Sequence, residues 1–424
     1  MSAAKVSHGV TETRREDSAS VRTSAVPSLN DELTHKIPRI RFKKWNDGWC
    51  KLAFTNIATI RRGLTYSPID CSSSGIRVLR SSNIDEDMFR LFQDDVFVKS
   101  DAVNIPSVKD KDILITAANG SSHLVGKHAL VRTDGNGEMV HGGFMLLATS
   151  KEAAFLNASM CTPWYREFIE SNMMGGNGAL GNLPKKAFDE LQLIAPVSVA
   201  ERDYIGTCFE TLNVLISVRQ SALAKLQALK KSMLLNMFPQ GDAKVPKIRF
   251  KGFEGEWKEV GYSDVFDRIP SKRYQIQSSE YQECGAFPVL DQGKECVCGY
   301  SDNEYRVFRG SAKPVVIFGD HTREVKFADF DFVVGADGTQ LLAPKKMDSL
   351  FAYYLLSHLT IPNMGYSRHF KFVVDAVFQC PEDILEQRKI AAYFKSLDRL
   401  IAARRDEIEQ LKHMKAALLN RMFV

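Results

Sequence analysis

Long hydrophobic runs are missing from this sequence. No stretch approaches the roughly 18 consecutive apolar residues that a membrane-spanning helix needs. The N-terminal segment 1–35 also lacks the apolar core of a signal peptide. It is polar, mixed in charge and rich in Ser and Thr, a composition that predicts a disordered tail. We therefore expect neither membrane insertion nor secretion.

Metal-binding cysteine patterns are also missing. None of the eight cysteines forms a C-x-x-C pair, the spacing on which most zinc sites are built. Cys296 and Cys298 are separated by one residue and Cys284 lies well before them, which is not a zinc spacing. Free thiols in a reducing cytoplasm explain this usage most simply. The sequence predicts no metal in this chain and a cytoplasmic location.

Signatures of common enzyme classes are absent. We find no P-loop, no H-E-x-x-H, no G-x-S-x-G and no paired-carboxylate nuclease core, and the nine histidines do not cluster at ligand spacing. The stretch "GDHTRE" (319–324) suggests Asp–His catalysis, but no nucleophile accompanies it. Because it follows the apolar segment "PVVIF", a structural or DNA-contacting loop is favoured. The chain is predicted not to be an enzyme.

Size and charge set broad limits. With 424 residues, 44% hydrophobic and 25% charged, the chain is expected to form two or three globular domains. A net charge of +5 permits a nucleic-acid partner without requiring one.

Two segments of the chain occur twice. "KIPRIRFKKWNDGW" (36–49) returns as "KVPKIRFKGFEGEW" (244–257). The longer segment 196–238 returns without a gap as 381–423, so that Pro196 matches Pro381 and the endings "LLNMF" and "LLNRMF" nearly coincide. Self-similarity of this kind indicates one structural unit used twice. The stretches between the shared segments differ in length and sequence.

The longer shared segment predicts a helix in each copy. Apolar residues recur at helical spacing, and each copy opens with a Pro and an acidic residue, which is typical of a helix start. Each helix would have about 38 residues and a length of roughly 57 Å, and helices of this kind pair as coiled coils, here antiparallel. Arg219 and Arg404 occupy positions where an apolar residue is expected, so they either extend to solvent or fix the register. The residues that represent these helices are Leu212, Leu215, Arg219, Leu226, Leu397, Leu400, Arg404 and Leu411.

The variable middles predict mixed α/β structure. Strand-like segments in the first middle are "GIRVLRSSNI", "KDILITAAN", "HALVRT" and "FMLLATS", followed by a helix over 158–173. In the second middle they are "FPVLDQG", "KPVVIFGDHT", "KFADFDFVVGADG" and "QLLAPKK", followed by a helix over 349–359. The fold class is α+β: two mixed α/β domains separated by a long antiparallel two-helix coiled coil, with a pseudo-twofold internal repeat.

A glycine-rich loop follows the first of these short helices. Gly176, Gly178 and Gly181 spell G-x-G-x-x-G, which cradles a dinucleotide only when it leaves a strand and opens a helix. Here the glycines leave a helix, and the matching loop in the second half, "NMGYSRHFKF", keeps one glycine. A nucleotide cofactor is therefore not expected. A recognition loop whose backbone approaches an anionic ligand fits better.

These segments together resemble a known family. From about residue 36 onward the chain resembles the specificity subunit of Type I restriction–modification systems. The resemblance is carried by the twofold plan, by the helix entry "PEDILEQRKI" with its weaker copy "PVSVAERDYI", by the two helix endings, by "PVLDQG…GY…VVIFGDHT" and by "DILIT…GKHALV". In the weaker copy Arg202 stands where Gln is usual.

The resemblance implies a division of the chain and a set of partners. It implies a first target recognition domain over 36–198, a first spacer helix over 199–240, a second target recognition domain over 241–383 and a second spacer helix over 384–424. Each recognition domain would read half of a split double-stranded DNA target. Two methyltransferase subunits would methylate adenine, and restriction subunits would translocate and cut DNA. S-adenosylmethionine, Mg²⁺ and ATP would belong to those partners, with no cofactor in this chain, and no "NPPF"- or "DPPY"-like motif occurs.

Candidate DNA contacts are chosen from polar residues in the variable middles. Arg and Lys suit guanine and phosphate, whereas Asn and Gln suit adenine. The first domain offers Arg61, Arg62, Asn83, Asn119, Ser121, Ser122 and Asn177, and the second offers Lys272, Arg273, Gln292, His321, Arg323, Arg368, His369 and Lys371.

Two other functions remain open at this stage. One is a self-contained DNA-modifying enzyme, which would turn over DNA without partners. The other is a protein–protein adaptor with no role in nucleic-acid binding, whose assembled complex would select no DNA consensus.

Overall fold

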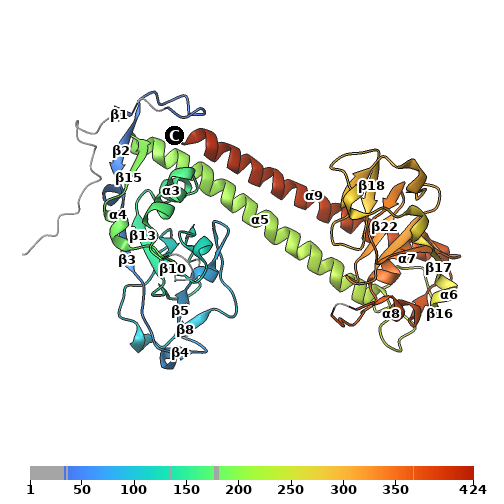
Figure 1. Cartoon of the computed structure of the whole chain (residues 1–424). Coiled ribbons are helices and arrows are strands. Elements are labelled where there is room, and N and C mark those ends of the chain that lie inside the picture. The colour runs from blue at the N-terminus through green and yellow to red at the C-terminus, as the bar shows by residue number, and fades with distance from the viewer. Residues whose placement is uncertain (1–32, 35–36, 134, 176–180, 366) are drawn as a thin grey trace, which may run out of the picture. The chain divides into compact units, whose positions relative to one another are not determined.

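The chain divides into two compact units. The computed structural model describes residues 33–34, 37–133, 135–175, 181–365 and 367–424. The first unit comprises residues up to Ser217 together with Gln410–Val424, and the second comprises Val218–Glu409. Both dividing points fall within the long helices α5 (Val199–Met237) and α9 (Ile384–Met422), each of 39 residues (Figure 1). No helix in the described ranges is long and apolar enough to cross a membrane.

The first unit is built on three sheets. Their strand orders are β11-β9-β13-β3, β12-β5-β8-β4 and β1-β2-β15. Neighbouring strands are antiparallel except β12 and β5, which are parallel. The strands are β1 (Leu33–Thr34), β2 (Trp49–Ala53), β3 (Ala58–Arg62), β4 (Cys71–Ser72), β5 (Ile76–Leu79), β8 (Val96–Val98), β9 (Ile113–Thr116), β11 (His128–Leu130), β12 (Met139–His141), β13 (Met145–Ser150) and β15 (Gln192–Pro196), with the two-stranded pairs β6 (Ile84–Asp85) with β7 (Met88–Phe89) and β10 (Ala118–Asn119) with β14 (Gly181–Asn182). The helices are α1 (Phe54–Ile57), α2 (Ala153–Ser159), α3 (Pro163–Asn172) and α4 (Lys185–Asp189).

The sheet β11-β9-β13-β3 is buried on both faces. Ile113 and Ile115 of β9 point to one face and pack in a core with α2, α3 and the start of α5, which also takes in Leu419 and Met422 of α9. Leu114 points to the other face and packs in a separate core with residues of β5 and β12. Alternate residues of a strand point to opposite faces, so a continuous apolar run is needed to fill two cores.

The second unit repeats this plan with its own strands. The sheets have the orders β17-β24-β21-β22, β19-β18-β23-β20 and β16-β25, and β18 with β23 is the parallel pair. Val316 and Phe318 of β21 pack against α7, whereas Val315 and Ile317 join the core shared with β18 and β23. The elements are β16 (Lys258–Gly261), α6 (Tyr262–Val265), β17 (Phe266–Ile269), β18 (Phe287–Leu290), β19 (Gly299–Ser301), β20 (Val307–Phe308), β21 (Val315–Gly319), β22 (Val325–Ala328), β23 (Phe332–Val334), β24 (Thr339–Pro344), α7 (Ser349–Ser357), α8 (Phe370–Val374) and β25 (Val377–Cys380).

The shared segments form the same aromatic cluster in each unit. In the first unit Phe423 lies 6.0 Å from Trp49, 5.8 Å from Phe155 and 5.8 Å from Phe209, measured between ring centroids. In the second unit the matching rings are those around Phe238, with centroid distances of 5.9 Å to Trp257, 5.7 Å to Phe351 and 6.1 Å to Phe394. The Phe that follows the last residue of each long helix therefore packs in the core of a unit with the Trp of an opening motif. Each aromatic ring of this size contributes a large buried area.

Within the second unit, α5 and α9 lie side by side and run antiparallel (Figure 1). Arg219 Nε lies 2.6 Å from Glu407 Oε1, and further along Lys230 Nζ lies 2.5 Å from Asp398 Oδ1. The residue number therefore rises along one helix while it falls along the other.

The mixed α/β class and the long helix after Pro196 are as predicted, and two local expectations are corrected. The segment 1–35 was expected to be disordered, but Leu33 and Thr34 pair with Cys50 and Trp49 as strand β1, and the rest of the segment lies outside the described residues. The helix expected over 158–173 is two helices. The second, α3, begins at Pro163 because Pro is favoured at the first position of a helix.

Candidate functional site

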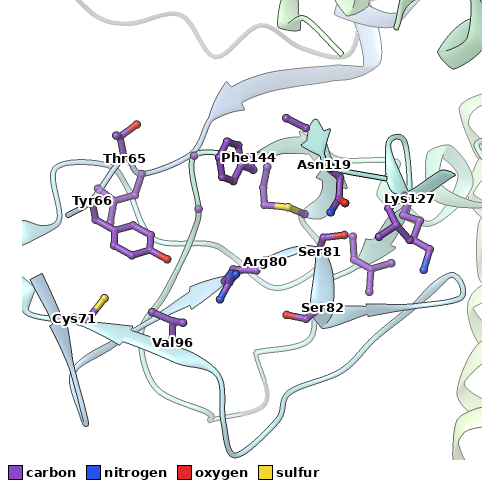
Figure 2. A pocket seen from close by; sticks show the side chains of 18 of the residues that line it. Thr65, Tyr66, Cys71, Arg80, Ser81, Ser82, Val96, Asn119, Lys127 and Phe144 are labelled. Atoms are coloured by element: carbon purple, nitrogen blue, oxygen red, sulfur yellow. The ribbon is translucent and has the colours of Figure 1, made fainter. Parts of the chain in front are cut away.

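A pocket of about 1020 Å³ opens in the first unit. Its walls include the segment after β3, the turn after β5, strand β10 with the residue that follows it, Leu124 and Lys127 before β11, and the turn that joins β12 to β13. Figure 2 shows Phe144, Arg80 and Asn119 around the same space, with Tyr66 and Lys127 on opposite sides of the view.

The lining of this pocket combines an apolar floor with a polar and aromatic rim. Leu64, Ile84 and Met145 are at most 3% exposed and form part of the floor. At the rim, Phe144 is 66% exposed, which is unusual for a large aromatic residue. An arrangement of this kind is typical of a ligand-binding site.

Two cations, Arg80 and Lys127, line the pocket. Among the residues that the structure describes, neither the Arg80 guanidinium nor the Lys127 ammonium has a hydrogen bond or ion pair. The Asn119 side-chain oxygen accepts a hydrogen bond from Ser121 N at 3.0 Å, which leaves the amide NH₂ as a donor for a ligand. The pocket therefore offers positive charge and a hydrogen-bond donor.

The predicted contacts of the first domain divide into surface and interior positions. Asn119 lines the pocket, and Ser121 and Ser122 follow it as exposed residues. Asn83, by contrast, is fully buried: Oδ1 accepts from Arg80 N at 2.8 Å, and Nδ2 donates to Arg90 O and Asp95 Oδ1 at 3.0 and 2.8 Å. This corrects the expectation that Asn83 faces a ligand, because its amide is used to hold the turn that carries Arg80.

The two arginines of β3 differ in the same way. The Arg61 guanidinium donates to Pro106 O and Ser107 O at 2.6 and 2.8 Å and lies 3.5 Å from the Asp112 carboxylate. Its hydrogen-bonding groups are therefore used in contacts within the protein. Arg62 is exposed at the end of the strand. Asn177, together with Gly176 and Gly178, lies outside the described residues. Gly181 is described and forms β14.

In the second unit, Asp320 connects two of the predicted loops. Asp320 is 3% exposed; its carbonyl oxygen accepts from His369 N at 2.8 Å and its carboxylate from Phe370 N at 2.8 Å. His321 Nδ1 lies 3.2 Å from Ser367 O. The "GDHTRE" loop is therefore docked on the segment that follows α7, and the geometry supports a structural role for its Asp.

Several predicted residues meet at this junction. Gln292 Nε2 donates to Asp337 O at 2.8 Å, and its Oε1 accepts from His321 N at 3.1 Å. Arg323 adopts a positive φ of 64° and donates to Ile361 O at 3.2 Å. Both side chains are thus used to shape the loops.

The remaining candidates of the second unit are mostly exposed. Arg368 and Lys371 lie at the surface beside the junction. His369 is fully buried with Nδ1 3.0 Å from Asp320 O, which corrects the expectation that its ring contacts a ligand. Lys272 and Arg273 are exposed on a short 3₁₀ turn.

The residues chosen to represent the long helices include both buried and exposed positions. Leu397 and Leu411 are buried, whereas Leu400 is 50% exposed. Leu212, Leu215 and Leu226 are half-buried. Arg219 and Arg404 bind the same carboxylate, since Arg404 Nη1 lies 2.5 Å from the second oxygen of Glu407. Arg219 thus pairs with a residue of the other helix, and Arg404 pairs with a residue of its own helix. Both arginine side chains stay partly exposed.

Several buried or partly buried groups have shifted pKa values. Burial raises the pKa of Cys161 and Cys380 to about 12 and that of Cys298 to about 11, so these thiols stay protonated. Burial lowers the pKa of His141 and His358 to about 4. In the described ranges, no group of three or more His, Cys, Asp or Glu side chains is placed to hold a metal ion.

The pocket residues that the sequence did not indicate include Arg80, Lys127 and Phe144. The signal for Phe144 was present, because it follows Gly142 and Gly143 in a turn between two strands, where a large apolar residue has no core to fill. The two cations carried no such signal, since nothing in the sequence shows that they lack partners.

Comparison with known proteins gives related sequences and a related fold. No family model matches the sequence. The specificity subunit of the Type I restriction enzyme EcoR124I/EcoR124II from Escherichia coli is 30% identical over 111 residues, which make up 26% of this chain and 27% of that protein. The StySPI specificity subunit from Salmonella potsdam is 27% identical over 198 residues, which make up 44% of this chain and 40% of that protein. The aligned parts thus span less than half of each relative.

A solved structure matches almost the whole chain. The S subunit of a Type I restriction–modification system from M. genitalium superposes with a TM-score of 0.63 at 14% sequence identity, over 92% of this chain and 99% of that chain. This chain resembles Type I specificity subunits. The resemblance inferred from the sequence is confirmed in both sequence and fold.

Proposed function

We propose that this chain is the non-catalytic DNA-specificity subunit of a Type I restriction–modification complex. The observation that carries the proposal is the repeated frame. The shared segments make the same contacts in each unit, whereas the loops that the frame supports differ. A common frame with divergent loops suits a protein that presents one surface twice to identical partners and reads two different half-sites.

The proposal assigns a task to each part of the chain. Residues 36–198 and 241–383 are the two target recognition domains of a split double-stranded DNA site. The helices over 199–240 and 384–424 form an antiparallel spacer with pseudo-twofold symmetry and carry the contacts to two methyltransferase subunits. Restriction subunits join the same assembly. Methylation and cleavage, with their S-adenosylmethionine, Mg²⁺ and ATP, belong to those partners, and the complex acts on DNA in the cytoplasm.

Exposed apolar residues on the long helices support a partner surface. Val214 and Val218 of α5 and Leu400 of α9 are each at least 50% exposed, and an apolar side chain with this exposure gains free energy when a partner covers it. Charge reversal at exposed positions of 212–238 or 397–423 is expected to abolish assembly with the methyltransferase subunits. Normal assembly of such variants would place the partner surface elsewhere.

Mapping of methylated adenines tests the DNA role. The chain is produced in cells with its methyltransferase subunits, and the genome is sequenced by a method that detects adenine methylation. One split motif is expected. Random methylated positions, or methylation by the purified chain alone with S-adenosylmethionine and Mg²⁺, would contradict the proposal.

The two-reader arrangement predicts half-specific effects. Arg368→Ala combined with Lys371→Ala is expected to relax only one half of the motif, because both exposed cations belong to the second unit. Lys313→Ala is the matched control: Lys313 is exposed in the same unit but lies before β21, outside the segment after α7 that carries Arg368 and Lys371. Relaxation of both halves, or of neither, would remove these residues from the set of readers.

A further inference from the structure

The floor of the pocket in the first unit is suited to the face of a flat ring. Leu64, Ile84 and Met145 present buried apolar surface, and Phe144 adds an exposed aromatic ring at the rim. A base within an intact duplex shows a protein only its edge and its phosphate, both of which are polar. The apolar face of a base becomes accessible only when the base leaves the stack.

The backbone at Phe144 is held firmly while its side chain stays exposed. Ala117 N and Ala118 N both donate to Phe144 O, at 2.9 and 3.0 Å. The turn before it is tightly packed, because a Cβ atom on Gly63 would lie 2.0 Å from Gly142 O. A large aromatic residue at a fixed, solvent-facing position adds nothing to the core, whereas it is preorganised to stack on a ligand.

The polar groups of the pocket complement a nucleotide. Arg80 and Lys127 are cations without protein partners among the described residues, and two such charges match a phosphate on either side of an extruded nucleotide. The Asn119 NH₂ group can donate to a ring nitrogen or a carbonyl oxygen of the base. A volume of about 1020 Å³ accommodates a base with its sugar, since ligand pockets measure about 300–1,000 Å³.

We infer that this pocket receives one base that has left the stack of the bound DNA. Phe144 stacks on the base, Asn119 donates to its edge, and Arg80 and Lys127 bind the flanking phosphates. The inference rests on the proposed function, because it needs DNA held against the first unit. It adds that this unit reads a base outside the duplex as well as base edges within it.

Fluorescence of 2-aminopurine tests the inference. The split target is first established by methylation mapping, and the base analogue is then placed in turn at each position of the target in duplexes bound by the assembled complex. At one position in the half read by the first unit, fluorescence is expected to change on binding, because the analogue is unstacked from its neighbours. A complex that binds the target with no fluorescence change at any position would overturn the inference and leave the proposed function intact.

Variants of the pocket assign the effect to its residues. Phe144→Ala is expected to weaken target binding by about 5- to 150-fold, the range found when an aromatic stacking partner of a base is removed, and to restore fluorescence to that of free DNA. Phe144→Trp keeps an aromatic ring and is expected to retain binding. Lys186→Ala is the control, because Lys186 is an exposed cation of the same unit that does not line the pocket. Equal binding by the Ala and Trp variants and the wild-type complex would overturn the inference.

A free nucleotide presents the same chemistry, and a separate arm distinguishes the two sources. Binding of adenosine monophosphate and of S-adenosylmethionine to the full chain without DNA is measured by calorimetry. No binding up to about 1 mM is expected, because a single nucleotide lacks the phosphate on its second side. Saturable binding that Phe144→Ala removes would show a site for a free nucleotide and overturn the assignment to DNA. Failure of the complex to select any split target would instead contradict the proposed function.

Discussion

Arg41 donates two hydrogen bonds to the carboxylate of Glu201, at 2.6 and 2.7 Å. Arg41 belongs to the opening motif and Glu201 to the first turn of α5, so the bond joins the two sequence segments that occur twice. The second copy makes the same bond: Arg249 donates to Glu386 at 2.7 and 2.8 Å. Both carboxylates are 1% exposed, which makes each pair a buried, bidentate clamp at a helix start.

Breaking this clamp from one side is expected to be costly. Arg41→Met leaves Glu201 buried without a counter-charge and should lower the free energy of unfolding by about 3–5 kcal/mol. The double variant Arg41→Met with Glu201→Leu removes both charges and should recover most of that loss, since a buried ion pair is often replaceable by apolar residues. Denaturant unfolding of the wild type, of Arg41→Met, of Glu201→Leu alone and of the double variant measures the coupling.

The control for this cycle is Arg39→Met. Arg39 is exposed two residues before Arg41, and its replacement should change the free energy of unfolding by less than about 0.5 kcal/mol. A double variant as unstable as Arg41→Met alone would show that the loss comes from packing of the arginine rather than from an isolated charge.

Arg202 takes the place that Gln387 has in the second copy. Gln387 Nε2 donates to Pro381 O at 2.8 Å and its Oε1 accepts from Asp348 N at 2.9 Å. Arg202 likewise donates to Pro196 O and forms an ion pair with Glu152. Arg202 therefore faces Glu152 in the first copy, whereas Gln387 faces Asp348 in the second copy.

Exchanging both residues tests this pairing. Arg202→Gln alone should lower the free energy of unfolding by about 1–3 kcal/mol, because Glu152 loses its partner. Adding Glu152→Asp should recover much of this loss, because Asp348 caps α7 by accepting from Leu350 N and Phe351 N, and an Asp at position 152 can cap α2 in the same way. Thermal unfolding measures the effect. A double variant that is less stable than Arg202→Gln would contradict the pairing.

The two ion pairs between the long helices in the second unit should differ in their response to salt. Glu407 is partly exposed, and its pKa is lowered chiefly by hydrogen bonding to Arg404 and then to Arg219. Its contribution to stability is therefore present above the usual pKa of Glu, and it is lost as pH falls or as salt screens the charges. We expect Glu407→Gln to be mildly destabilising at low salt and neutral at 1 M salt.

Asp398→Asn provides the comparison. Asp398 accepts from Lys230 and also from the Tyr354 hydroxyl at 2.8 Å, and Tyr354 is 1% exposed. Loss of a charged acceptor for a buried hydroxyl should cost about 1–3 kcal/mol at any salt concentration. Salt dependence of equal size in the two variants would show that both pairs are solvated surface contacts.

His358 is expected to make the second unit sensitive to acid. Burial lowers the pKa of His358 to about 4 from its usual 6.5. The unfolded chain therefore binds a proton between these values that the folded chain does not bind. Stability should be full above pH 6.5, fall by about 3 kcal/mol as pH decreases to 4, and then level off.

His358→Thr should remove this dependence. In the first unit Thr162 occupies the matching position after α2 and donates to Ser159 O at 2.7 Å, as His358 Nδ1 donates to Leu355 O at 2.6 Å. The variant keeps a comparable hydrogen bond, so its unfolding free energy, measured from pH 7.5 to 4.5, should decrease less steeply than that of the wild type. Parallel curves would show that other groups cause the acid sensitivity.

Sequence patterns were most informative where a residue's neighbours are set by periodicity. The strand segments of both middles contain β5, β9, β13, β18 and β21, and all of β24 except Thr339, because continuous apolar runs between turn residues have few other ways to be buried. The pattern failed for Asn83 and His369. Polar residues beside turns are usually exposed, but here the surrounding chain closes over them and uses their hydrogen bonds.

The sequence by itself determined the repeated plan, the long helices and the resemblance to Type I specificity subunits, because these depend on spacing along the chain and on which residues occur twice. Only the tertiary structure decided which polar side chains remain available to a ligand. Arg61 and Arg77 have acceptors within hydrogen-bond distance, whereas Arg80 and Lys127 have none among the residues that the structure describes. That distance is set by chain segments far apart in the sequence, so the local sequence pattern does not predict whether a side chain has a partner.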